Sequence, residues 1–270
     1  MPELPEVETV KETLKKQVLN DTILEVEVNW DNIIEYPTVE EFKKQIKNQK
    51  INDIKRRGKW LMFYLDDYVL LSHLRMEGRY FIKHDEEVTK HEHVIFKLKS
   101  GRTLRYIDTR KFGKMHLIKK EEVMTSEPLK SLGLEPWDKN LDINYLKEKY
   151  KNKRLPIKTV LLDQSILVGN GNIYADEVLF LSKINPHKKA SELTDEELKG
   201  IIENTKTVLE NAIKLGGTTI RTFESSEGVH GLFQNELHVH GMSICKTCNQ
   251  NILVDKIGGR STYYCPNCQK

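Results

Sequence analysis

The chain opens with Met-Pro-Glu-Leu-Pro-Glu-Val-Glu-Thr-Val, residues 1–10. Apolar residues then recur every three or four positions as far as Val18, which predicts an amphipathic helix from about Pro5 to about Leu19. The apolar side of such a helix would fix the start of the chain against a hydrophobic core. One interpretation of residues 1–10 is an ordinary helix start, because proline and acidic residues suit a first turn.

A second interpretation of this stretch is chemical. Removal of Met1 would leave Pro2 with a free secondary amine, and α-amino groups titrate near about pH 7.7–8.0, so part of the population would be neutral and nucleophilic. Attack by that amine on a carbonyl-level carbon gives an iminium, which withdraws electrons from the substrate. Glu3 and Glu6 lie beside Pro2 in the sequence and are candidate proton donors and acceptors.

The composition is that of an ordinary globular protein with one large or two modest domains. The chain has 270 residues, of which 38% are hydrophobic and 31% charged. No apolar run approaches the roughly 20 residues of a membrane helix, and the acidic start is unlike a signal peptide. We therefore expect a cytoplasmic protein that is monomeric and has no membrane partner.

The net charge of +3 conceals a segregation of charge along the chain. Residues 97–120 contain nine basic residues and one acid, whereas residues 191–210 contain six acids and two lysines. Basic residues gathered on one face would favour a polyanionic partner. The alternative is that both stretches are simply solvated surfaces.

All four cysteines lie in the last 26 residues, as two Cys-x-x-Cys pairs separated by sixteen residues. This spacing is typical of a tetrahedral zinc site formed by Cys245, Cys248, Cys265 and Cys268. Two disulfides are the alternative, which a reducing cytosol disfavours. Four thiolates leave no open coordination position, so we expect one structural Zn²⁺ ion.

The first half of the chain consists mainly of short strand-like runs. Asp66-Asp67 and Ser100-Gly101 are typical turns, and Thr38 with Glu41 forms a capping box before a second helix. This pattern indicates a β-sandwich or barrel with the early helices packed on it. The expected strands are residues 23–28, 59–65, 68–74, 79–83, 93–98, 103–107 and 114–118.

The second half is helical until a final hairpin. We expect helices at 143–150, from Pro156 through Leu162, at 173–181 and from Thr194 to Ile213, and then a hairpin of residues 252–257 and 260–264. The pattern predicts an α+β multidomain protein: an N-terminal β-sandwich flanked by helices, a helical domain and a C-terminal zinc-ribbon β-hairpin. The expected divisions are 2–125 (β-sandwich), 126–140 (linker), 141–230 (helical domain) and 231–270 (zinc finger).

Two polar features of the second half are suited to phosphate. Gly169-Asn170-Gly171-Asn172 is a tight turn before a helix, where backbone N–H groups are available to an anion; a plain helical hairpin is the alternative. Arg260 follows the hairpin turn and would present a guanidinium from a metal-stabilised hairpin; an exposed turn arginine is the alternative.

Several motifs together resemble the bacterial formamidopyrimidine-DNA glycosylase family. They extend from Pro2 to Cys268, and Leu4 favours this family over the related endonuclease VIII group, which usually has glycine there. The motifs are residues 1–10, Arg56-Arg57-Gly58-Lys59, residues 73–78, residues 108–113, Gly171-Asn172-Ile173-Tyr174, and the four-cysteine ribbon with Gly259-Arg260.

The resemblance implies an enzyme that removes 8-oxoguanine and formamidopyrimidines from double-stranded DNA, preferably opposite cytosine, in the bacterial cytoplasm at the nucleoid. It also implies that residues 2–125 form the catalytic domain and that residues 141–230 form a DNA-binding helix-two-turn-helix domain. Pro2 would attack C1′ of the damaged nucleotide, and the resulting Schiff base would allow β- and δ-elimination. Glu3 would protonate the sugar ring oxygen. Lys59 would be catalytic beside the lesion phosphate, and the family's proton donors correspond to Glu3, Lys59 and Arg260.

The resemblance also implies a set of DNA contacts. Met76 would fill the space left by the extruded nucleotide, Phe112 would wedge beside it, and Arg110 would hydrogen-bond the unpaired cytosine. Glu77 is a candidate contact of the flipped base, and residues 221–236 correspond to the loop that covers the lesion. The full set of expected DNA-binding residues is His73, Met76, Arg110, Phe112, Lys158, Asn172 and Arg260.

Two positions depart from the family pattern: Asn170, where an apolar residue is usual, and His240, near which the family tends to have tyrosine. Two other functions stay open at this point. One is a zinc-ribbon DNA-binding protein without catalysis, for example one in which a retained Met1 blocks Pro2. The other is an enzyme for oxidised pyrimidines, like endonuclease VIII.

Overall fold

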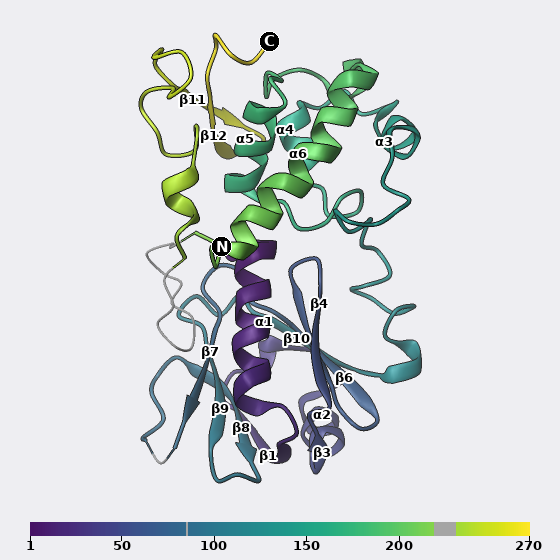
Figure 1. Cartoon of the computed structure of the whole chain (residues 1–270). Helices are drawn as coiled ribbons and strands as arrows, with labels where there is room; N and C mark the ends of the chain where they lie inside the picture. The colour runs from purple at the N-terminus through teal and green to yellow at the C-terminus, as the bar shows by residue number, and fades with distance from the viewer. Residues whose placement is uncertain (85, 219–230) are drawn as a thin grey trace. The chain divides into compact units, whose positions relative to one another are not determined.

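The structure is a computed structural model that describes residues 1–84, 86–218 and 231–270 (Figure 1). The chain forms two units. The first contains residues 1–2, 6–130, Thr218 and Gly231, and the second contains residues 3–5, 131–217 and 232–270. Most of the predicted lesion-covering loop, residues 221–230, lies outside the described residues.

The described part of the first unit contains two five-stranded sheets, in the orders β3-β1-β8-β9-β7 and β2-β10-β6-β5-β4. The expected β-sandwich flanked by helices is confirmed. The strands are β1 Thr22–Val28, β2 Ile34–Tyr36, β3 Gln49–Lys50, β4 Asp53–Arg57, β5 Trp60–Tyr64, β6 Tyr68–His73, β7 Arg79–Lys83, β8 Glu92–Leu98, β9 Thr103–Ile107 and β10 Lys114–Lys119. The helices are α1 Leu4–Val18 and α2 Val39–Ile46, with 3₁₀ turns η1 Asp31–Ile33 and η2 Lys120–Glu122.

Helix α1 joins the two sheets through one core. Figure 1 shows it running between the strands labelled β7 to β9 and those labelled β4, β6 and β10. Val7, Leu14 and Val18 are fully buried there with residues from both sheets, as the helical spacing predicted. Helix α2 begins at the predicted capping box of Thr38 and Glu41.

The second unit is helical and ends in a hairpin, in agreement with the prediction. Leu4 is fully buried in its core, which lies around α5 and α6. The predicted helix included Leu162, whereas α4 ends one residue earlier, at Leu161. The elements are α3 Ile143–Tyr150, α4 Ile157–Leu161, α5 Asn172–Leu181, η3 Ala190–Glu192, α6 Asp195–Lys214, η4 Phe233–Glu236, β11 Leu253–Ile257 and β12 Arg260–Tyr264.

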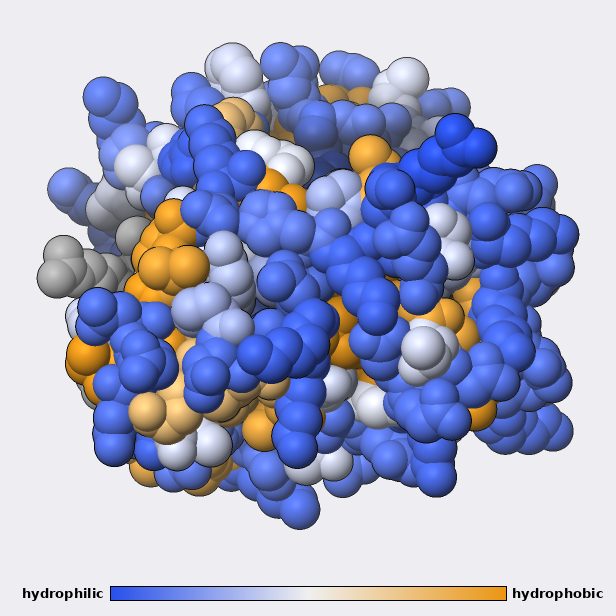
Figure 2. Space-filling view, turned by 90° about the horizontal axis from the view of Figure 1, so that it is seen from above, coloured by the Kyte–Doolittle hydropathy of each residue, from blue (hydrophilic) through white to orange (hydrophobic). Residues whose placement is uncertain are grey.

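The surface drawn in Figure 2 is mostly hydrophilic, as expected for a chain in which 31% of the residues are charged. On the face drawn in Figure 2, the apolar groups of the described residues form small separate patches. Among the described helices, none combines the length and the apolar character needed to cross a membrane.

Candidate functional site

Glu3 stands at the amino-terminal end of helix α5. Its carboxylate accepts hydrogen bonds from the backbone N–H groups of Gly171, at 2.6 Å, and Ile173, at 3.1 Å, and the residue is 3% exposed. The first N–H groups of a helix lack partners within it, and the helix dipole favours a carboxylate there. Glu3 therefore caps α5, and the residue after Pro2 has a fixed position.

Gly171 makes this close approach possible. A Cβ atom on this residue would lie 2.3 Å from Cδ of Glu3 and 2.6 Å from its Oε1, far inside van der Waals contact. Leu4, the next residue, donates its backbone N–H to the Gly169 carbonyl at 3.2 Å. Close packing and hydrogen bonds thus hold the Gly169–Gly171 loop against Glu3 and Leu4.

Pro2 is buried, and its nitrogen forms the peptide bond with Met1. The lone pair of an amide nitrogen is delocalised into the carbonyl group, so the nitrogen is not a nucleophile. The chemistry predicted for Pro2 therefore depends on removal of Met1.

Lys59 lies in the turn between β4 and β5 and is only 6% exposed. The sequence had placed it at the start of a strand, whereas the strand begins one residue later, at Trp60. Arg56 supports the turn: its Nη1 donates to the Gly58 carbonyl at 3.0 Å, and its Nε pairs with Glu8 of α1 at 2.8 Å. Because Arg56 stabilises this turn, the Lys59 side chain has a defined position.

His73, at the end of β6, is held as a neutral imidazole. Burial, together with the positive charges of Arg75 and Lys59, lowers its pKa to about 3. Its Nδ1 accepts the backbone N–H of Arg75 at 3.0 Å, and its ring packs edge-on against Trp60, with centroids 4.8 Å apart. Because Nδ1 is an acceptor, the proton resides on Nε2, and His73 can offer an uncharged N–H donor.

Two loops of the first unit carry the three residues expected to replace the extruded nucleotide. The Met76 loop is residues 74–78, and the Phe112 loop is residues 108–113. Phe112 is 47% exposed, the guanidinium carbon of Arg110 lies 4.7 Å from its ring centre, and Met76 is half-buried. An exposed phenylalanine with an arginine on its face is suited to stacking on bases.

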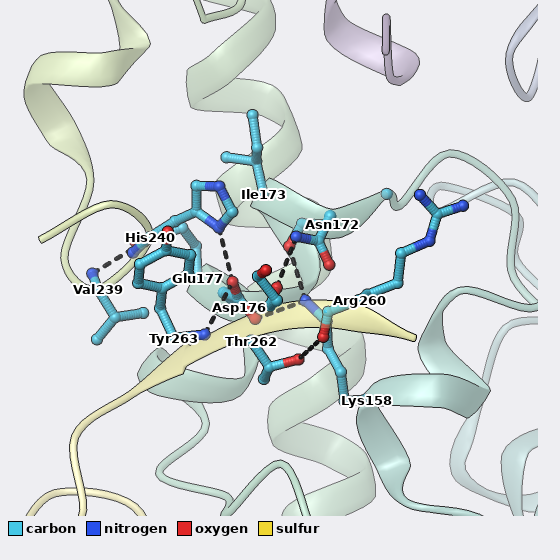
Figure 3. Close-up of polar contacts among 12 residues, drawn as sticks. Lys158, Asn172, Ile173, Asp176, Glu177, Val239, His240, Arg260, Thr262 and Tyr263 are labelled. Atoms are coloured by element: carbon cyan, nitrogen blue, oxygen red, sulfur yellow. Dashed lines mark hydrogen bonds and ion pairs between the residues drawn. The ribbon is translucent and has the colours of Figure 1, made fainter. Parts of the chain in front are cut away.

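Lys158, which we expected to contact DNA, is fully buried (Figure 3). Its Nζ donates to Asp176 Oδ1 at 2.5 Å and to the Asn172 carbonyl oxygen at 2.7 Å. Burial lowers the pKa of Lys158, although the Asp176 carboxylate acts in the opposite direction. The ammonium thus supports the first residue of α5, and a direct contact with DNA would require it to leave Asp176.

Asp176 is a central acceptor that the sequence reasoning missed. Besides Lys158, its carboxylate lies 2.6 Å from Nδ1 of His240 and accepts the backbone N–H of Tyr263 at 3.3 Å (Figure 3). The His240 ring also packs on that of Tyr263, with centroids 4.7 Å apart. The departure at His240 therefore places an imidazole between α5 and strand β12.

Glu177, the next residue, was also missed. Its carboxylate accepts the backbone N–H groups of residues 238–240 at 2.8–3.0 Å. Burial acts to raise the pKa of Glu177, but the hydrogen bonds from His238 and these N–H groups hold it below its ordinary value. Two adjacent acids inside the apolar run 173–181 were the available signal, because buried carboxylates require partners.

Asn172 and Arg260 lie where α5 meets the hairpin. Asn172 Nδ2 donates to the Ser261 carbonyl at 2.8 Å, which ties the helix start to β12. Arg260 is exposed, and Figure 3 shows its side chain extending away from the Asp176 cluster. A helix terminus beside an exposed guanidinium is a suitable phosphate site.

The four cysteines predicted to bind metal come together at the base of the hairpin. Their Sγ atoms all lie within 4.8 Å of one another, with Cys245 3.9 Å from Cys268 and Cys248 3.5 Å from Cys265. Four thiolates around a Zn²⁺ ion at about 2.3 Å would be about 3.8 Å apart, so the donor set fits a metal ion in tetrahedral geometry. Gln269 anchors the cluster by bonding the Cys265 N–H and the Ile184 carbonyl.

Comparisons with known proteins agree with this arrangement. Residues 1–115 match the formamidopyrimidine-DNA glycosylase N-terminal domain, and residues 132–224 match the formamidopyrimidine-DNA glycosylase H2TH domain. The chain is 48% identical to a formamidopyrimidine-DNA glycosylase of Oceanobacillus iheyensis, over 100% of this chain and 98% of the relative. It is 49% identical to one of Bacillus cereus, over 100% and 99%.

Solved structures give the same result. A Lactococcus lactis Fpg variant in complex with Fapy-dG-containing DNA is 38% identical, with a TM-score of 0.93 and full coverage of both chains. The complex of Lactococcus lactis Fpg with abasic-site DNA has the same identity, coverage and TM-score. From its sequence motifs, its fold and these full-length matches, the chain belongs to the formamidopyrimidine-DNA glycosylase family.

Proposed function

We propose that this protein is a bifunctional DNA glycosylase and AP lyase of base excision repair that removes oxidised purines from duplex DNA. The observation that carries the proposal is the placement of Glu3. A buried carboxylate next to Pro2 is fixed by two backbone N–H groups at the start of α5, where an acid can be held against a substrate sugar.

The reaction begins once Met1 has been removed. The Pro2 nitrogen bonds to C1′, the glycosidic bond breaks, and the base leaves with the proton that the amine gives up. Glu3 then donates a proton to the ring oxygen as the sugar opens. The product is an iminium between Pro2 and C1′. Loss of a C2′ proton expels the 3′ phosphate, and loss of a C4′ proton then expels the 5′ phosphate, which cuts the strand on both sides. Water releases the sugar fragment from the enzyme. Lys59 and Arg260 are the further proton donors in this proposal.

The remaining site residues bind and deform the duplex. Lys59, Asn172 and Arg260 contact the phosphates around the extruded nucleotide, and His73 adds an uncharged donor. Met76, Arg110 and Phe112 occupy the space that the nucleotide leaves, with Arg110 giving the preference for lesions opposite cytosine. Lys158 acts on DNA by supporting the carbonyl of Asn172.

The cysteine cluster holds one structural zinc ion in this proposal. Cys245, Cys248, Cys265 and Cys268 are its ligands. Bound zinc would keep the hairpin that carries Arg260 in one conformation and would take no part in the reaction, since four thiolates complete its coordination. The protein acts as a monomer on DNA in the cytoplasm.

The test is borohydride trapping on a duplex with 8-oxoguanine opposite cytosine. Protein lacking Met1 should form a covalent adduct with the DNA, and the same protein acetylated at its N-terminus should form none. A non-catalytic DNA-binding protein would bind the duplex and give no adduct in either form. A thymine-glycol duplex in parallel distinguishes an enzyme specific for oxidised pyrimidines, which would cut it faster than the 8-oxoguanine duplex.

A further inference from the structure

The Met76 and Phe112 loops are both held in conformations that need support. Arg75 and Lys111 have φ angles of 54° and 59°, in the left-handed region that residues with a side chain seldom adopt. Such conformations persist where surrounding contacts determine them. In the Met76 loop, the Arg75 N–H donates to Nδ1 of His73. The other contacts of the two loops converge on two buried residues, Tyr106 and Asp108.

Asp108 supports the whole backbone of the Phe112 loop. The residue is fully buried, and its carboxylate accepts the N–H groups of Arg110 at 3.0 Å, Phe112 at 2.9 Å and Gly113 at 2.8 Å. The remaining N–H group, that of Lys111, points to the Asp108 carbonyl at 3.3 Å. Every backbone N–H from Arg110 to Gly113 therefore ends on Asp108, which leaves the side chains of Arg110 and Phe112 directed outward.

Tyr106 connects this loop to the Met76 loop. Its hydroxyl lies 3.4 Å from Oδ2 of Asp108, and its ring is fully buried. A Cβ atom on Gly113 would lie 1.8 Å from the Tyr106 hydroxyl oxygen, and one on Gly78 would lie 2.2 Å from it. Each glycine ends one of the two loops, so a single hydroxyl is packed against both.

The chemistry of this hydroxyl is fixed. Burial, and then the charge of Asp108, raises the pKa of Tyr106 well above its ordinary value. The group is therefore protonated at neutral pH, and its O–H can donate to the Asp108 carboxylate.

We infer that Tyr106 and Asp108 are positioning residues that hold the Met76 and Phe112 loops at one separation, so that Met76, Arg110 and Phe112 enter the base stack together. This inference rests on the proposed function, because it assigns those three side chains to the space of an extruded nucleotide. Extrusion costs a few kcal/mol. Loops that are ordered before DNA binds add no ordering cost to that step.

The test uses two tyrosine-to-phenylalanine variants that each remove one buried hydroxyl. Tyr106→Phe removes the hydroxyl between the two loops. Tyr80→Phe is the matched control, because Tyr80 is on the neighbouring strand β7, its ring centre lies 5.2 Å from that of Tyr106, and its hydroxyl donates instead to Ser72 at 2.7 Å.

Two single-turnover rates are measured for each protein: excision of 8-oxoguanine opposite cytosine, and cutting at a preformed abasic site. An abasic nucleotide needs little unstacking, so its cutting depends less on the loops. The ratio of the two rates should fall about tenfold in Tyr106→Phe, which corresponds to about 1.4 kcal/mol, and should stay at the wild-type value in Tyr80→Phe. Loss of folded protein would lower both rates equally and leave the ratio unchanged.

Asp108→Asn gives a second route if Tyr106→Phe folds poorly. It keeps the size of the side chain but turns an amide N–H toward the loop N–H groups, so the same fall in the ratio is expected. Suppose that the wild-type protein excises 8-oxoguanine and that the ratio of the two rates is unchanged in folded Tyr106→Phe or Asp108→Asn. This result would overturn the inference and leave the proposed function intact. Wild-type protein that neither traps nor excises would overturn the proposed function itself.

Discussion

At the scale of single residues, Glu3 combines a structural and a proposed chemical role. Its two carboxylate oxygens cap α5 by accepting the N–H groups of Gly171 and Ile173. The ordinary interpretation of the N-terminal stretch, a helix-start carboxylate, is thus half correct, although the helix that Glu3 caps is α5 rather than α1. The same bonds fix the acid in place for proton transfer.

Glu3→Gln separates the two roles. Glutamine keeps the size of the side chain but has no transferable proton, so excision of 8-oxoguanine should fall by about 10²–10⁴-fold. Cutting at a ready-made abasic site should persist in part, because the aldehyde is already exposed to the Pro2 amine. Single-turnover assays on the two substrates measure both quantities.

The control for this prediction is Pro2→Gly, which keeps an N-terminal amine and should still form some borohydride adduct. Unfolding curves of Glu3→Gln would report any loss of the α5 cap. If Glu3→Gln excises 8-oxoguanine at the wild-type rate, Glu3 serves only as a cap and another acid, such as Glu6, donates the proton.

His73 provides a pH prediction. Its pKa is lowered from 6.5 to about 3, so between these values the unfolded chain binds a proton that the folded chain does not. The stability that His73 contributes is therefore complete above pH 6.5 and decreases as the pH is lowered toward 3. Urea unfolding of wild-type and His73→Asn protein at pH 7 and 5 should show a larger loss for the wild type, because asparagine does not titrate.

NMR gives an independent measurement of the same residue. The ring protons of His73 should not shift between about pH 5 and 8, whereas an exposed histidine titrates in that range. A His73 midpoint near 6.5 would show that the imidazole is charged on the acid side of neutrality and would contradict its assignment as a neutral donor.

At the scale of elements, the spacing of apolar residues predicted the helices and strands that bury one face. Helices α1, α2 and α6 carried apolar spacing or capping boxes and were found where expected. Strands β2, β3 and β4 were not predicted, and each lies at an edge of its sheet. β4 reads Asp-Ile-Lys-Arg-Arg with only Ile54 buried, because an edge strand pairs on one side and can remain polar.

The sequence predicted those parts of the candidate site that form a motif. It did not predict the pairings between side chains that are distant in the sequence. The four cysteines were placed correctly from their spacing, because a tetrahedral site imposes that spacing. Lys158 was assigned from the family resemblance to DNA, but its burial depends on Asp176, which lies eighteen positions later in the chain. A sequence does not specify such long-range pairings by periodicity or by composition.

The hairpin of β11 and β12 provides the prediction at this scale. Cys248→Ser should remove one of the four thiolates and release the proposed zinc ion, because binding in thiolate sites is worth roughly 10–16 kcal/mol and depends on the complete ligand set. The hairpin would then lose its support, and duplex binding should be lost. Strands β5 and β6 belong to the other unit and should keep their amide-exchange protection.

Zinc content, duplex affinity and amide exchange on the same preparation check this prediction together. Chelation of zinc from the wild type should reproduce the result without a substitution. Zinc-free protein that binds the duplex as tightly as the wild type would exclude a role for the metal in presenting Arg260.

At the scale of the whole molecule, the basic stretch of residues 97–120 is less cationic than its composition suggests. Four of its nine basic residues form ion pairs: Lys97 with Glu25 and Glu27, Arg102 with Asp21, Arg105 with Glu92, and Lys114 with Glu35. Arg110 and Lys111 are both exposed and belong to the Phe112 loop. Lys99, Lys119 and Lys120 are exposed as well, so the charge available to a polyanion is divided between that loop and two other positions along the stretch.

The number of cations that contact the duplex can be measured from the salt dependence of binding. Each phosphate neutralised by a cation contributes a slope of about −0.9 to the plot of log affinity against log salt. Arg260 is exposed beside the start of α5, so Arg260→Ala should weaken binding to any duplex sequence and reduce the slope by about one unit.

Arg102→Ala is the matched control, because Arg102 lies at the opposite end of β9 from the Phe112 loop and is paired with Asp21. Its slope should equal that of the wild type. An unchanged slope in Arg260→Ala would remove this guanidinium from the phosphate contacts, and the hairpin would then act on DNA only through Asn172, which it holds by the Ser261 carbonyl.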